Sequence, residues 1–118
     1  MEITATYPAV HQKLLERMSR LSEAAPQTMS GFGALHEAAT ADGALKKRVK
    51  ELIALAIAIT VRCDGCIAFH VTAALESGAS REEIIDAIGV AVLMGGGPSV
   101  VYGSEALEAL EQISASTC

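Results

Sequence analysis

The chain of 118 residues contains no tryptophan, two tyrosines and two phenylalanines, although 51% of it is hydrophobic. A core without large rings must be built from alanine, leucine, isoleucine and valine, which suits closely packed helices. The mean hydropathy of +0.37 is high for one small domain, because such a domain has much surface and little interior. We therefore expect apolar surface to be buried between the subunits of a homo-oligomer.

Long apolar runs, an excess of basic residues and a secretory signal are also missing. The longest apolar run, residues 52–59, is far below the ~20 residues that a membrane-spanning helix needs. The first residues lack the basic start and apolar stretch of a signal peptide, so we expect a cytoplasmic protein. The net charge of −5 argues against a nucleic-acid partner. The one basic cluster, Lys46–Arg48 with Lys50, is interpreted as the solvated face of a helix.

Cysteine is scarce, with three residues in the chain, yet Cys63 and Cys66 are separated by only two residues. In a chain without a secretory signal, a closely spaced pair indicates redox or metal chemistry rather than a structural staple. Two thiols at this spacing can close a small disulfide, and so can store and release two electrons. The third cysteine, Cys118, follows a small polar run at the end, and no role is expected for it.

Helical periodicity dominates the chain and predicts one all-α domain, residues 1–118, of five or six helices. Gly31 and Gly33 interrupt the second predicted helix, and Asp64–Gly65 is expected to break the chain between the third and the fourth. Gly78 is placed to cap the fourth helix, and Ser80–Glu83 has the form of a capping box that opens the fifth. The predicted helices cover residues 8–24, 26–41, 44–62, 64–77, 80–94 and 99–113.

The break at Asp64 places Cys66 in the first turn of a helix, where free backbone N–H groups and the helix dipole favour an anion. This setting lowers the pKa of a thiol and makes it a nucleophile. His70 follows one turn later on the same face and can act as its base. Glu51 lies in an apolar stretch, and either faces solvent beside Lys47 or turns inward to pair with His70. On periodicity alone the solvated position is favoured.

The pattern of Glu51, eleven residues, Cys63-x-x-Cys66, three residues and His70 resembles the alkylhydroperoxidase D (AhpD)-like branch of the carboxymuconolactone decarboxylase family. The stretches 50–56, 66–70 and 94–98 are similar to the same family, and the resemblance covers about residues 41–110. It implies an all-helical fold, with the CxxC pair at the start of a central helix, that assembles into trimers or hexamers. It also implies that Cys66 is the attacking thiolate, that Cys63 resolves it, and that Glu51 and His70 relay protons.

The activity implied by this resemblance is an antioxidant one, the reduction of hydroperoxides without a cofactor or metal. A dithiol donor, either a lipoyl group or a thioredoxin-like protein, would then restore the reduced cysteines. The AhpD enzyme carries a histidine immediately before its second cysteine, where this chain has Gly65, so its substrate and donor need not carry over. The true lactone decarboxylases of the family generally lack the cysteine pair, which argues against decarboxylation here.

Two other interpretations use the same residues. Cys63, Cys66, His70 and Glu51 could hold a zinc ion, although no second ligand pair such as CxxC or HxxxH exists in the chain. Alternatively, the cysteines are only buried small residues in a non-catalytic oligomeric protein of the same family.

The remaining histidines and large side chains are given structural interpretations. His11 is expected to be solvated, and His36 to be a surface or partly packed residue. Phe69 and Tyr102 are the aromatic residues that could line a pocket near the thiols. The methionines are interpreted as packing residues: Met18, Met29 and Met94.

Overall fold

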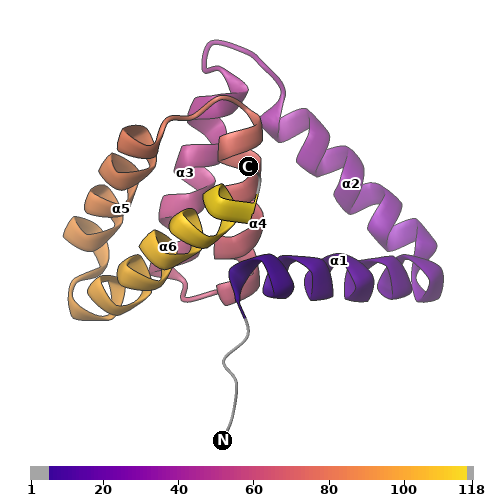
Figure 1. The fold of residues 1–118 in the computed structure, drawn as a ribbon. Coiled ribbons are helices and arrows are strands. Elements are labelled where there is room, and N and C mark those ends of the chain that lie inside the picture. Colours follow the sequence, from indigo (N-terminus) through magenta and orange to yellow (C-terminus); the bar gives the residue numbers. More distant parts are fainter. Residues whose placement is uncertain (1–5, 117–118) are drawn as a thin grey trace, which may run out of the picture.

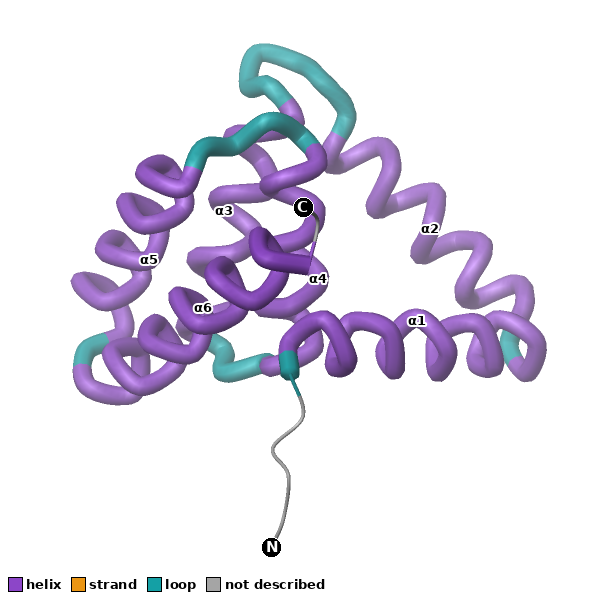
Figure 2. Tube along the Cα trace, viewed as in Figure 1, coloured by secondary structure: helices purple, strands orange, loops and turns teal. Residues whose placement is uncertain are grey.

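The computed structural model describes residues 6–116, and these residues form helices and the connections between them (Figures 1 and 2). The predicted all-α fold is confirmed, and no strand occurs in that range. The helices are α1 (Tyr7–Ala24), α2 (Pro26–Thr40), α3 (Lys47–Thr60), α4 (Asp64–Glu76), α5 (Arg81–Gly95) and α6 (Gly97–Ser116). No helix in the described part of the chain is both long and apolar enough to cross a bilayer.

Helices α3 and α4 form the centre of the molecule, with α5 and α6 packed against them on one side (Figure 1). Both central helices contribute fully buried apolar side chains, because their sequences are apolar on nearly every face. Alanines lie between these larger residues and let the helix axes approach closely. The fully buried large apolar side chains of the core are Leu55, Ile59, Ile67, Val71, Ile84 and Leu110.

Helices α1 and α2 form a V-shaped arm on the other side of the centre (Figure 1). Each contains a single buried residue, Tyr7 at the start of α1 and Thr40 at the end of α2. The backbone N–H of Tyr7 donates to Oε1 of Gln112 at 2.7 Å, which fastens the arm to α6. The arm is therefore held mainly at its two ends, and Phe32 and Leu35 remain exposed on α2.

Several predicted boundaries differ from the structure for local reasons. The third helix begins at Lys47 rather than at residue 44, because Oδ1 of Asp42 accepts the backbone N–H of Lys47 at 2.7 Å. The last helix begins two residues earlier than expected, with Pro98 in its first turn, where a missing N–H costs nothing. Helix α2 continues through its two glycines. Met94, interpreted as a packing residue, is 76% exposed.

The connection between α3 and α4 is made by Arg62 and not by the Asp64–Gly65 pair. Arg62 adopts a left-handed conformation with φ of 60°. Its N–H donates to the carbonyl of Ile59 at 3.1 Å, and the N–H of Cys63 donates to that of Ala58 at 3.1 Å. This is a Schellman cap, in which glycine is the usual left-handed residue. Helix α4 begins at Asp64 as predicted, but Gly65 lies inside it, and the turn itself is made at Arg62.

The caps of the fourth and fifth helices agree with the prediction. Gly78 has φ of 95°, a backbone conformation that residues other than glycine rarely adopt. The hydroxyl of Ser80 accepts the N–H of Glu83 at 3.1 Å, and the Glu83 side chain accepts the N–H of Ser80 at 2.9 Å. The capping box therefore fixes the start of α5.

We predict that Gly95→Ala destabilises the fold by about 1–3 kcal/mol, because the added methyl group would overpack the contact between α5 and α6. A Cβ at this position would collide with the hydroxyl of buried Ser99 and would lie 2.8 Å from its Cβ. Gly89 lies on the same helix with open space around it, so Gly89→Ala should stabilise by about 0.5–1 kcal/mol. Urea unfolding of both variants measures the difference, and equal effects of the same sign would contradict the packing argument.

Candidate active site

The two cysteines of the motif are joined in a disulfide at the N-terminus of α4. Cys63 is the N-cap residue, and its Sγ accepts the backbone N–H of Cys66 at 3.3 Å. Cys66 lies in the first turn, as the sequence predicts. The hydrogen bond, however, brings the electrostatic advantage of the helix terminus to the sulfur of Cys63. The preference for Cys66 as the nucleophile then depends on its nearness along the helix to His70.

Glu51 is completely buried, and Oε1 of its carboxylate lies 2.8 Å from Nδ1 of His70. Of the two positions that the sequence leaves open for Glu51, the structure selects the inward one. Helices α3 and α4 pack together in this region and bring the two side chains face to face. Since a carboxylate accepts hydrogen bonds, Nδ1 of His70 is the donor, and the neutral ring carries its lone pair on Nε2.

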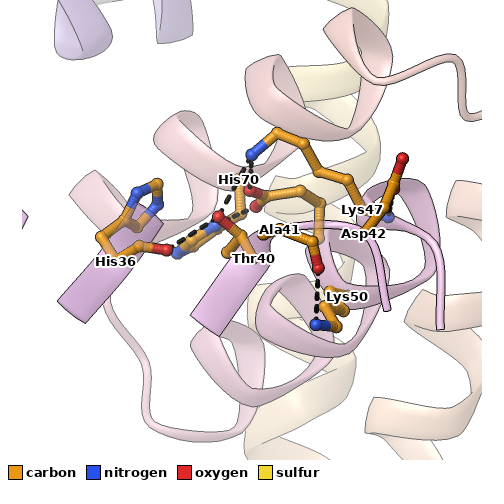
Figure 3. Close-up of polar contacts among 8 residues, drawn as sticks. His36, Thr40, Ala41, Asp42, Lys47, Lys50 and His70 are labelled. Carbon is orange, nitrogen blue, oxygen red and sulfur yellow. Dashed lines mark hydrogen bonds and ion pairs between the residues drawn. The ribbon is translucent and has the colours of Figure 1, made fainter. Parts of the chain in front are cut away.

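A second contact of Glu51 leads toward the arm. Nζ of Lys47 lies 3.4 Å from Oε2 of Glu51 and 3.2 Å from the hydroxyl of Thr40. The Thr40 hydroxyl in turn donates to the backbone carbonyl of His36 at 2.8 Å. Lys47, expected on a solvated face, is 44% exposed and still pairs with the buried carboxylate. A continuous polar chain therefore runs from His70 through Glu51, Lys47 and Thr40 to α2 (Figure 3).

A cavity of about 420 Å³ lies between the arm and α4. Both cysteines and His70 form part of its wall, so the disulfide opens onto this space. Gly65 also lines it, and a side chain there would meet Leu14 at an ordinary contact distance of 3.7 Å. The absence of a side chain at Gly65 thus leaves room beside the sulfurs, whereas the helical backbone at this position does not require glycine. The lining residues are Leu14, Met18, Ser22, Met29, Phe32, Gly33, His36, Cys63, Gly65, Cys66, Phe69 and His70.

The structure adds two histidines to the surroundings of the site. The rings of His11 and His36 lie 5.9 Å and 5.6 Å from that of Phe69, which in turn lies 5.1 Å from His70. His11 is partly buried, so the expectation that it is solvated is wrong, and His36 lines the cavity. Phe69 lines the cavity as proposed from sequence, whereas Tyr102 packs against the core.

The sequence could not identify His11 and His36 as neighbours of the site. Their proximity depends on the arm folding back over α4, a long-range arrangement that leaves no local pattern. Met18 and Met29, interpreted as packing residues, also belong to the cavity wall.

The donor set does not fit the alternative of a zinc site. Among residues 6–116, no three His, Cys, Asp or Glu side chains gather in a way that could hold a metal ion. The two sulfurs are bonded to each other, and Nδ1 of His70 is engaged by Glu51.

A polar cluster links the first residue of α4 to α1 and α6. The hydroxyl of buried Tyr7 donates to Oε1 of Glu105 at 3.0 Å, and Glu105 also hydrogen-bonds the side chain of Asp64. Burial and this bond to Asp64 raise the pKa of Glu105, although the bond from Tyr7 lowers it. Burial and Glu105 raise the pKa of Tyr7 above its usual range. The bond from Tyr7 to Glu105 therefore ties α1 to α6 close to the start of α4.

Comparison with known proteins supplies the family. The model of the carboxymuconolactone decarboxylase family matches residues 26–109. The chain belongs to this family. The match includes α2, α3, α4, α5 and most of α6, and therefore every residue of the disulfide and of the Glu51–His70 pair.

Solved and curated relatives agree with the family. A crystal structure of a carboxymuconolactone decarboxylase family protein from Legionella pneumophila is 44% identical, with a TM-score of 0.88 over 92% of this chain and 96% of that one. A family protein from Thermotoga maritima, described with a possible involvement in antioxidative response, is 31% identical, with a TM-score of 0.71 over 77% and 94%. An uncharacterised protein of Cupriavidus necator is 42% identical over 80% of this chain and 84% of its own.

We predict that the free energy of unfolding depends on pH through Glu105. The Glu105 carboxyl group holds its proton more tightly in the folded chain than in the unfolded chain. The contribution of Glu105 is therefore favourable at low pH and is lost as pH rises from the ordinary value of 4.5 through the raised pKa. Relative to the parent, Glu105→Gln should gain unfolding free energy as the pH rises above the ordinary value of 4.5.

Urea unfolding at a series of pH values measures this effect. Glu37→Gln, which changes an exposed glutamate on α2, is the matched control and should follow the parent more closely. A Glu105→Gln variant whose stability runs parallel to the parent at every pH would contradict the assignment.

Proposed function

We propose that the protein is a thiol-dependent peroxidase that reduces hydroperoxides through the Cys63–Cys66 dithiol. The observation that carries the proposal is the opening of the disulfide onto a cavity that His70 also lines, with His70 paired to buried Glu51. A redox pair, a base and a substrate-sized space thus occur together. The possible antioxidative involvement described for the Thermotoga maritima relative supports the same chemistry.

In the first step, His70 removes the proton from Cys66, and the thiolate attacks the distal oxygen of the hydroperoxide. The O–O bond breaks, a sulfenic acid forms on Cys66, and the alkoxide takes the proton from His70 and leaves as an alcohol. Glu51 accepts the hydrogen bond from Nδ1 of His70, and its negative charge stabilises the imidazolium while the proton is held there.

In the second step, Cys63 loses its proton and its thiolate attacks the sulfur of the sulfenic acid. The S–O bond breaks, the hydroxide takes up the proton that Cys63 released and leaves as water, and the disulfide forms. The N-cap position suits this resolving role, because the N–H of Cys66 points at the sulfur of Cys63 and favours its ionised form. An external dithiol, a lipoyl group or thioredoxin-like protein, then reduces the disulfide in two exchange steps and becomes oxidised itself.

We also propose that the protein acts as a cytoplasmic homo-oligomer, a trimer or a hexamer. Many large apolar side chains are exposed in the single chain, and they occur on the arm, on α3, and on α5 and α6. Leu93, at 78% exposed, is the most exposed of them. Contact between subunits would remove such surface from water.

We predict that Cys66→Ser abolishes turnover of an organic hydroperoxide, and that Cys63→Ser stops after one oxidation because its sulfenic acid cannot be resolved. His70→Ala and Glu51→Ala should each lower the rate by roughly a hundredfold or more, because general acid–base catalysis contributes about that much. Peroxide consumption is measured with several dithiol donors, in a Cys118→Ser background that leaves two thiols per chain.

The Cys118→Ser parent is the control and should turn over normally. A Cys66→Ser protein that reduces peroxide as fast as this parent would overturn the proposal. Loss confined to the two cysteine variants would leave a simple dithiol and remove the proton relay.

We predict that light scattering of the purified protein gives a mass three or six times the 12.2 kDa of one chain. Burial of the exposed apolar surface between copies is the physical reason. A mass of one chain over the whole accessible concentration range would rule the oligomer out.

A further inference from the structure

The Nε2 atom of His36 has no role in the contacts described so far. It is buried and has no hydrogen-bond partner among residues 6–116, although the His36 side chain forms part of the cavity wall. Folded proteins leave few buried polar atoms unpaired, because such an atom has lost its water without gaining a partner. A bound molecule could supply the hydrogen-bond partner that Nε2 of His36 lacks.

Other contacts hold His36 in place without using Nε2. Its backbone carbonyl accepts the hydroxyl of Thr40, and that hydroxyl is bonded to Lys47, the neighbour of the buried carboxylate (Figure 3). Its ring meets Phe69 edge-on, with an angle of 83° between the ring planes. The imidazole therefore packs against the aromatic ring from α4, while its backbone belongs to the hydrogen-bonded end of α2.

The chemistry of the cavity wall leaves few groups that could bind an oxygen atom. No carboxylate, ammonium or guanidinium group belongs to the described lining. Apart from the two sulfurs, its polar side chains are Ser22, His36 and His70. His70 already has Nδ1 bound to Glu51 and acts as the base of the proposed reaction. His36 is thus the imidazole of the described lining that the proposed reaction leaves unused.

We propose that His36 is a substrate-binding residue whose Nε2–H donates a hydrogen bond to the hydroperoxide oxygen that becomes the alcohol. The inference rests on the proposed function and adds a residue to it. When the thiolate of Cys66 attacks the distal oxygen, negative charge develops on the other oxygen as the O–O bond breaks. A fixed N–H in a largely apolar cavity stabilises that charge, while the proton itself returns from His70.

His11 provides a matched control inside the same molecule. Its ring also packs against Phe69, and its Nδ1 is likewise buried without a partner in the described part of the chain. His11 does not belong to the cavity wall, however. Replacing His11 therefore removes a comparable ring and a comparable unpaired nitrogen without touching a bound molecule.

The first experiment measures binding without turnover. Cumyl alcohol, the product of cumene hydroperoxide reduction, is titrated into the oxidised protein and followed by the imidazole NMR signals. We expect His36→Phe to weaken binding by about tenfold, since one hydrogen bond is lost. His36→Gln, which keeps an N–H donor, should recover part of the loss, and His11→Phe should bind as the parent does.

The second experiment measures the rate at which cumene hydroperoxide oxidises the reduced protein in a single turnover. His36→Phe should lower this rate by up to about a hundredfold, as for loss of one donor to a developing oxyanion. The rate of Cys66 alkylation by iodoacetamide should stay at the parent value, because His36 does not act on the thiol. A merely structural role for His36 would change both rates together.

The outcomes separate the two proposals. Equal affinity of the parent and His36→Phe for cumyl alcohol overturns the role of His36, whatever the rate of peroxide reduction. The same holds if His11→Phe weakens binding as much as His36→Phe. If the parent protein fails to form its disulfide with hydroperoxide, the proposed function fails, and the alcohol titration still decides whether His36 binds an oxygen atom.

Discussion

The buried carboxylate of Glu51 is the constraint on which the site depends. An unpaired charge at this depth would be costly, so the fold must bring partners to it. His70 from α4 and Lys47 from the preceding turn of α3 supply them. The pairing fixes the two central helices relative to each other, and Lys47 extends it to Thr40 at the end of the arm. One ionised group therefore organises three helices around the cysteines.

The cavity combines a mostly apolar wall with a few polar groups. Its floor carries the sulfurs and His70, and its sides carry leucine, methionine and phenylalanine from the arm. Such walls exclude water and strengthen every electrostatic contact inside. Gly65 contributes by what it lacks, because the missing side chain leaves space beside the disulfide. The shape of the cavity thus depends on the arm, the part of the fold least anchored to the core.

Much of the fold could be predicted from the sequence because it depends on local chemistry. Apolar periodicity placed the six helices, and the Ser80 capping box and Gly78 fixed two of their ends. The motif placed the cysteines at the start of a helix. Arg62 could not be predicted, since arginine is disfavoured in the left-handed conformation and only the tertiary structure holds it there. Periodicity also favoured the wrong, solvated position for Glu51, because its burial depends on a residue nineteen positions away. The same limitation applies to His11, His36 and the bond from Tyr7 to Glu105, which link segments far apart in the chain.

Cys63 belongs to two helices at once. Its backbone N–H closes the end of α3, and its sulfur caps the beginning of α4. No flexible residue separates the two helices at this point, so the N-terminal sulfur cannot move without disturbing one cap or the other. Each thiol consequently faces its partner at a high effective concentration, even when no bond joins them. Formation of the disulfide then requires rotation of the two cysteine side chains rather than rearrangement of a loop. The cysteine pair is therefore part of the junction between the two helices.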